Sequence, residues 1–176
     1  AENLLSEALD FDGDIVLTDM SHHSEQLPWR RLAERDQKDI NCLESIQGKI
    51  SINDAKNKIG ENTGLVVIPH ISNVFGVENP VGDITEIAHD NGAMVVLDAA
   101  QSVPHMNVDV KESDVDFLCF SGHKMLGPMG IGVLYGKERL LQEMKPYQVG
   151  GGMINSVGRN EIDYAEVPDK FEAGTP

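Results

Sequence analysis

With 176 residues and a formal net charge of −15 at pH 7, the chain is long enough for one sizeable core. Its acidity disfavours nucleic acid as a partner, because nucleic-acid affinity depends on clustered Lys and Arg. The 40% hydrophobic and 24% charged residues are typical of a globular protein, and no apolar run approaches the length that crosses a bilayer.

In chain order, the apolar patterning predicts a helix at 2–9, a strand at 15–17, a helix through Trp29 to about Arg35, a strand at 40–43, a helix from Ser51 to Gly60, and a strand at 65–68. It continues with a helix from Asp83 to Gly92, strands at 94–97, 114–120 and 131–135, and a short helix over Leu140, Leu141 and Met144. Ser51 with Asp54 three positions on is the pattern of a capping box.

Strand and helix alternation, with strands that are apolar on both faces, indicates an α/β domain on a mostly parallel sheet with helices on both faces. The loop that holds Lys124 is too short for a crossover, so the sixth strand should be antiparallel. In such sheets, ligands bind beyond the carboxyl ends of the strands. The loops at those ends contain His23, Asn73, Asp98, Gln101 and Lys124.

Lys124 lies in the turn Ser121-Gly122-His123-Lys124, between two apolar runs. At the rim of a sheet, burial and neighbouring cations can lower the pKa of an ammonium group and make the amine a nucleophile toward carbonyls. Ser121, His123 and the backbone N–H groups of the glycines are suited to bind a phosphate. An ordinary exposed lysine in a hairpin is the alternative.

Asp98 either caps the next turn or faces a bound cation, and Gln101 is either a surface amide or part of the same site. His22 and His23 lack the i, i+4 spacing of metal ligands, so we expect no metal, and one of them is suited to stack on a planar ligand. Cys42 and Cys119 fall in apolar runs without metal-ligand spacing, and no signal-like segment is present. We therefore expect core cysteines in a cytoplasmic protein.

A phosphate site, an acid at a strand end, an imidazole and an amine together suit pyridoxal 5'-phosphate (PLP). The carboxylate would hold the pyridine nitrogen protonated, and the amine would attach the cofactor covalently. Neither the dinucleotide motif GxGxxG nor the P-loop motif GxxxxGKS occurs in the chain.

The segments SNVFGVENP, DAAQ, FSGHKMLGPMGIGVLYG, GGGMI and FEAGTP resemble, in order and spacing, the class V aminotransferase family of PLP enzymes, with the large PLP-binding domain of fold type I. The resemblance covers residues 13–176 and is strongest to cysteine desulfurases of the sulfur-mobilising type, which are grouped with selenocysteine lyases. It implies that residues 1–176 are the central part of the large domain, with 148–176 an excursion at a homodimer interface.

By this resemblance, Lys124 would hold PLP and shuttle the substrate's α-proton, Asp98 would pair with the pyridine nitrogen, and Gln101 would bond the phenolic oxygen. His23 would stack on the ring and assist proton transfer, and Ser121 and His123 would bind the phosphate. Asn73 would line the substrate side. Thr175 would reach the phosphate of the other subunit.

The sequence departs from the family pattern in three respects. The family's HHxN motif reads His22-His23-Ser24-Glu25 here. The threonine-rich phosphate loop is expected before Ala1, and a small C-terminal domain with the persulfide-forming cysteine and the carboxylate-binding arginine is expected after Pro176. We therefore expect a fragment that is inactive alone.

The resemblance implies conversion of L-cysteine to L-alanine, with sulfur passed through an enzyme persulfide to a sulfur-acceptor protein and iron-sulfur cluster assembly. Another class V enzyme remains an alternative, whether an aminotransferase, a selenocysteine lyase or an epimerase-like member. A non-catalytic PLP-binding module is a further alternative.

Overall fold

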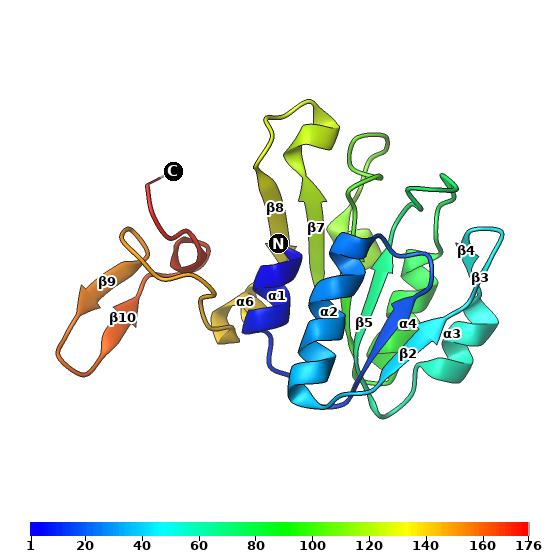
Figure 1. The fold of residues 1–176 in the computed structure, drawn as a ribbon, viewed down its shortest axis with the longest axis horizontal. Coiled ribbons are helices and arrows are strands. Elements are labelled where there is room, and N and C mark those ends of the chain that lie inside the picture. Colours follow the sequence, from blue (N-terminus) through cyan, green and yellow to red (C-terminus); the bar gives the residue numbers. More distant parts are fainter. Residues whose placement is uncertain (176) are drawn as a thin grey trace.

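The computed structural model describes residues 1–175 and is built around a six-stranded sheet (Figure 1). The strands are β1 (Asp14–Thr18), β2 (Ile40–Leu43), β5 (Thr63–Pro69), β6 (Met94–Asp98), β7 (Phe117–Ser121) and β8 (Gly132–Gly136), in the order β2-β1-β5-β6-β7-β8. All neighbours pair in parallel except β7 and β8, which are antiparallel. The predicted α/β class, the six strands and the antiparallel sixth strand are confirmed.

Helices cover both faces of this sheet because its strands are apolar on both sides. One face packs against α1 (Glu2–Ala8), α2 (His23–Asp36) and α6 (Glu138–Glu143). The other face packs against α3 (Ile52–Lys58), α4 (Val81–Asp90) and α5 (Val110–Ser113). None of the helices in the described residues is long and apolar enough to span a membrane.

The predicted capping box of α3 forms only in part. The Ser51 hydroxyl accepts a hydrogen bond from the Asp54 N–H at 3.3 Å, as an N-cap should. The Asp54 carboxylate does not return to Ser51. It accepts from the Glu44 N–H at 2.8 Å and pairs with Lys58 at 3.0 Å, which ties α3 to the end of β2.

Several predicted boundaries are shifted. Helix α4 begins at Val81, after Pro80, two residues before Asp83. Asp114 does not start a strand, because it ends α5 in the left-handed conformation at φ 49°, and β7 begins only at Phe117. Cys119 is buried as predicted, whereas Cys42 in β2 is partly exposed.

Two short hairpins were not predicted. The first pairs β3 (Ser45–Ile46) with β4 (Lys49–Ile50), and the second pairs β9 (Ile154–Val157) with β10 (Ile162–Tyr164) before the 3-10 turn η2 (Asp169–Phe171). Figure 1 shows β9 and β10 beyond α6, to the side of the sheet. The described part of this C-terminal segment, residues 148–175, therefore has local structure of its own, anchored by Met153, which is fully buried.

Candidate functional site

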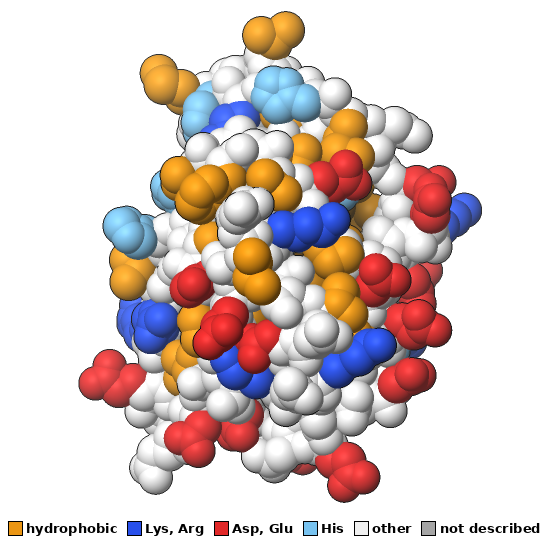
Figure 2. Space-filling model, turned by 90° about the vertical axis from the view of Figure 1, so that its right-hand side faces the viewer, with side chains coloured by type: hydrophobic (Ala, Val, Ile, Leu, Met, Phe, Trp, Pro, Cys, Tyr) orange, Lys and Arg blue, Asp and Glu red, His pale blue; other side chains and the backbone are white. Residues whose placement is uncertain are grey.

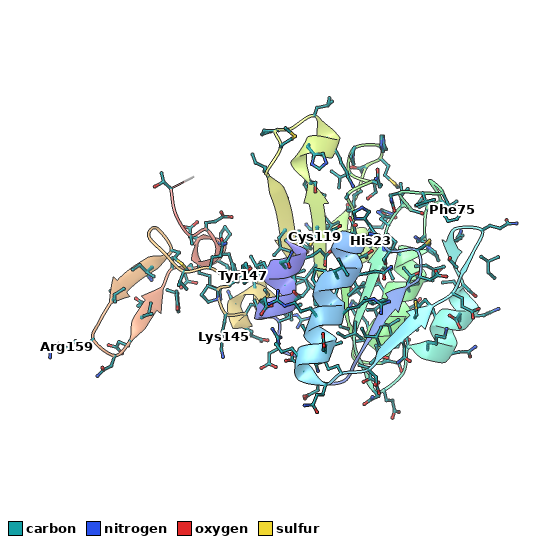
Figure 3. The ribbon with its side chains drawn as sticks, viewed as in Figure 1. His23, Phe75, Cys119, Lys145, Tyr147 and Arg159 are labelled. Atoms are coloured by element: carbon teal, nitrogen blue, oxygen red, sulfur yellow. The ribbon has the colours of Figure 1, made fainter. Side chains whose placement is uncertain are left out.

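The polar residues predicted at strand ends gather at one edge of the sheet. Strands β1, β5, β6 and β7 are parallel, so the loops that follow them lie at the same edge, which is the upper one in Figure 1. Figure 2 shows histidine side chains in the upper half of the molecule, and Figure 3 shows His23 there, at the start of α2.

Three of the predicted residues share one cavity. It has a volume of about 200 Å³ and is lined by Asp98, Ser121 and Lys124, together with Glu2, Ser24 and Cys119. We call it the lysine cavity. The pairing of β6 with β7 thus brings together a carboxylate, a hydroxyl and an amine. The carboxylate of Asp98 and the amine of Lys124 are 26 residues apart in the sequence.

A second cavity at the same edge has a volume of about 530 Å³ and is lined by two more of the predicted site residues. His23 and Asn73 line it with His22, Ser45 and Phe75. Gln101 is half-buried one turn after Asp98, His123 is exposed beside Lys124, and Thr175 is exposed in the C-terminal segment. None of these last three lines either cavity.

Asp98 ends β6 and uses one carboxylate oxygen locally. Its Oδ1 atom accepts a hydrogen bond from the Ala100 N–H at 2.8 Å, so the capping role is present. Its second oxygen accepts no hydrogen bond from the residues that the structure describes. Burial raises the pKa of Asp98, while the Ala100 N–H and the positive charges of Lys124 and His22 oppose that rise. One carboxylate oxygen therefore remains available to a ligand.

Lys124 is held in a tight 3-10 turn, η1 (Gly122–Met125), which follows β7 directly. The Gly127 N–H bonds the Gly122 carbonyl at 2.8 Å, and the Gly122 N–H bonds the Ile131 carbonyl at 2.9 Å. A Cβ atom on residue 127 would lie 2.9 Å from the Gly122 oxygen, so a glycine is required there. The turn is fixed by its backbone and presents a half-buried Lys124 to the cavity.

The two histidines have different tasks. His22 is the N-cap of α2, and its Nδ1 atom accepts from the Ser24 N–H at 3.2 Å and lies 2.7 Å from the Ser24 hydroxyl. The exposed His23 ring lies 6.1 Å from that of His22, with the ring planes 35° apart. No cluster of three or more metal-binding side chains exists within residues 1–175. His23 is thus the imidazole that is free to meet a ligand.

The loop that holds Asn73 is shaped by its neighbours. The Ser72 hydroxyl accepts from the backbone N–H groups of Val74 and Phe75, at 3.3 and 3.2 Å. The Phe75 ring packs against Gly48 in the turn of the β3–β4 hairpin, where a Cβ atom would lie 2.5 Å from it. The hairpin that the sequence did not predict therefore supports one wall of the second cavity.

Two acids near the lysine cavity, the half-buried Glu2 and the fully buried Glu25, were also missed. The Glu2 carboxylate accepts from the Trp29 indole N–H at 2.7 Å, and Glu25 is fully buried without a hydrogen bond to any described residue. Burial is the main cause that raises the pKa of both groups, to about 8 for Glu2. In the sequence, the departure from HHxN was the only signal for Glu25, and Glu2 had none.

A larger cavity of about 730 Å³ lies at the opposite edge of the sheet. The buried Asp116 beside it accepts from the Val95 N–H at 2.8 Å and pairs with His89 at 2.9 Å and with Lys137 at 3.1 Å. These groups satisfy one another, so we interpret this cluster as structural.

Comparison with known proteins agrees with the geometry. The family model described as "Aminotransferase class-V" matches residues 1–176. A protein of Halalkalibacterium halodurans named "Probable cysteine desulfurase" is 49% identical over 167 residues, which are 94% of this chain and 41% of that protein. Its namesake in Halobacterium salinarum is 44% identical over 182 residues, which cover 100% of this chain and 44% of the relative.

Solved structures extend the likeness to the fold. The apo cysteine desulfurase of Thermococcus onnurineus superposes with a TM-score of 0.92 at 42% identity over 99% of this chain and 45% of that one. The cysteine desulfurase CsdA of Escherichia coli gives 0.93 at 32% identity, with the same coverage. A variant of C-DES with glycine covalently linked to its PLP cofactor gives 0.87 at 26% identity, over 99% of this chain and 48% of that one.

The chain spans less than half the length of these relatives. The family model, in contrast, matches its whole length. The chain therefore belongs to the class V aminotransferase family.

Proposed function

We propose that the protein carrying this chain is a PLP-dependent cysteine desulfurase that converts L-cysteine to L-alanine. The observation that carries the proposal is the lysine cavity, where Lys124, Asp98 and Ser121 meet. The names of the relatives at 44% and 49% identity favour desulfuration over the other reactions of the family.

The residues at the cavity fit PLP in their chemistry. Asp98 has one carboxylate oxygen that no described residue occupies, which suits an acceptor for a protonated pyridine nitrogen. Lys124 offers an amine on a rigid turn, and Ser121 offers a hydroxyl at the end of β7. When bound, PLP supplies an electron sink for negative charge at the substrate's α carbon.

In this proposal the chain's own residues bind, orient and move protons. Lys124 would hold the cofactor and move the α-proton, and His23 would contact the cofactor ring and assist that proton transfer. Ser121 and His123 would bind the phosphate, while Gln101 would bond the phenolic oxygen. Asn73 would line the substrate side, and Thr175 would bind the phosphate in the other subunit of a homodimer.

Neither cysteine of the chain suits the persulfide-forming role. Cys119 is buried in β7, and burial raises the pKa of its thiol well above the usual value. Burial also raises the pKa of Cys42, which is held in β2. Because the thiolate is the nucleophile, both are poor candidates. We infer that the nucleophile lies outside residues 1–176, as the sequence departures predict.

We further propose that residues 1–176 are the central part of the large PLP-binding domain and that the protein acts in the cytoplasm. A sulfur-acceptor protein would take the persulfide sulfur toward iron-sulfur cluster assembly. The two free cysteines agree with a reducing compartment.

The test is an assay of the intact protein with L-cysteine, with L-selenocysteine and other amino acids as competing substrates. The proposal predicts stoichiometric alanine and sulfide when a reductant is present. Failure to form alanine from cysteine, together with turnover of another amino acid, would contradict it.

A further inference from the structure

Three carboxyl groups lie in the layer between the sheet and the helices α1 and α2. Asp98 is on the same face of β6 as Val96, because side chains alternate along a strand, and Val96 belongs to the core beneath α1 and α2. The register places Cys119 of β7 beside Asp98 on that face. Glu2 enters the layer from α1 and Glu25 from α2.

Glu25 is the least satisfied of these acids. It is 0% exposed, and neither of its carboxyl oxygens makes a hydrogen bond to a described residue. The buried Ser21 hydroxyl likewise has no hydrogen-bond partner there. Glu2 differs because it accepts from Trp29, and Asp98 differs because it accepts from the Ala100 N–H. An ionised carboxylate without any donor is strongly disfavoured in such a layer.

The charged groups around this layer favour a neutral Glu25 and an ionised Asp98. Burial is the main cause that raises the pKa of Glu25, and negative charge on Asp98 of β6 adds to it, while the nearby Ser21 hydroxyl, which makes no hydrogen bond to Glu25, opposes the rise only in part. Lys124 and His22 act on Asp98 and favour its ionised form. The Cys119 thiol stays neutral in this surrounding because its own pKa is raised.

We propose that Glu25 is a positioning residue for Asp98. It occupies the layer as an uncharged carboxylic acid, so that Asp98 is the ionised carboxyl group that faces the ligand. An asparagine, the residue of the HHxN pattern, would fill this place without charge, and Glu25 does so only by keeping its proton. The role of the Asp98 charge in binding PLP rests on the proposed function.

Infrared difference spectra of the intact apo-protein at pH 7 test which carboxyl group holds the proton. Glu25→Gln should remove the C=O band of a neutral carboxylic acid, whereas Asp98→Asn should remove bands of an ionised carboxylate. Glu34→Gln, an exposed position on the same helix α2, is the matched control and should remove ionised bands only. Loss of ionised bands in Glu25→Gln would overturn the proposal.

The pH dependence of folding gives a second readout. If Glu25 keeps its proton in the folded state, the ratio of the folding constants of wild type and Glu25→Gln should fall by up to about tenfold per pH unit above pH ~5. A pH-independent ratio, as expected for Glu34→Gln, would contradict the assignment. PLP binding by the wild-type protein is measured alongside. If the wild-type protein does not bind PLP, the proposed function is wrong. The infrared spectra and the folding ratios would still show whether Glu25 is protonated.

Discussion

In the proposed function, Asp98 combines a structural and a chemical task in one side chain. Its Oδ1 atom caps the turn after β6 through the Ala100 N–H, its second oxygen accepts no hydrogen bond from a described residue, and the side chain lines the lysine cavity. A carboxyl group that only capped a turn would not need to lie beside Lys124. The two tasks can be separated, because an amide oxygen can cap the turn equally well but carries no charge.

Asp98→Asn should therefore leave the fold intact and weaken PLP binding by about 10- to 100-fold, the value of one charge-assisted hydrogen bond. Spectroscopic titration of the intact protein with PLP measures this. In wild type the affinity for PLP should fall as the pH drops through the raised pKa of Asp98. The variant should not show this loss of affinity at low pH. Equal affinity of the two proteins would contradict the assigned role.

Glu2 predicts a pH effect on stability. Its pKa is raised from 4.5 to about 8 in the folded chain, so the folded state holds a proton that the unfolded state releases above pH 4.5. Its contribution to stability is therefore fully present below pH 4.5 and is lost as the pH rises toward 8. Glu2→Gln, which keeps the acceptor for Trp29, should flatten the stability profile in this window. Chemical denaturation at several pH values measures it, and a slope equal to that of wild type would contradict the account.

The turn η1 shows how a short element fixes the backbone of Lys124. It joins two antiparallel strands, and its shape depends on close contact between the backbones of Gly122 and Gly127. The backbone of Lys124 is therefore fixed, and only its side-chain torsions can vary. Pre-organisation of this kind lowers the entropy lost when a ligand is held.

Gly127→Ala should distort this turn, because the new Cβ atom would meet the Gly122 oxygen at 2.9 Å. We expect a loss of about 1–3 kcal/mol in stability and weaker PLP binding. Gly82→Ala is the control. Its Cβ atom meets nothing within 4 Å in α4, so stability should be unchanged or higher. Unaltered PLP binding by Gly127→Ala would show that the turn is not the determinant.

The elements that the sequence predicted well are those with strong patterns. The apolar runs at 65–68 and 94–97 became the buried strands β5 and β6, and Ser51 caps α3. The hairpin β3–β4 was missed because its strands have two residues each, too few for a period to appear. The sequence also did not predict that Glu25 and Asp98 share one layer of the fold, since this depends on how α2 packs on the sheet.

The site prediction had a similar limit. Strand ends indicated which residues share an edge, and Asp98, Ser121 and Lys124 do share a cavity. The distribution of His23 and Asn73 into a second cavity depends on loop shape, which Ser72 and Phe75 determine through local contacts. The roles of the individual residues toward PLP stay predictions.

Apolar side chains on the β9–β10 hairpin support the proposed homodimer. Val157 and Ile162 face each other across this hairpin and are 64% and 51% exposed. Tyr147 and Val149 add exposed apolar surface just before it. Large exposed apolar patches commonly mark interfaces.

Val157→Lys should therefore shift the intact protein from dimer to monomer in sedimentation velocity. Ser156→Lys is the control, because Ser156 points to the opposite face of the hairpin, where it pairs with Asp163. Dimers that persist in Val157→Lys at low protein concentration would argue against this face as the interface.

The central claim is that Lys124 is the residue that holds PLP. Borohydride reduction of the intact protein loaded with PLP, followed by peptide mapping in a mass spectrometer, tests it most directly. The account predicts one pyridoxyl group per chain, on the peptide that contains Lys124, and none in Lys124→Ala. Labelling of another lysine, or no label on a protein that is folded and saturated with PLP, would contradict it.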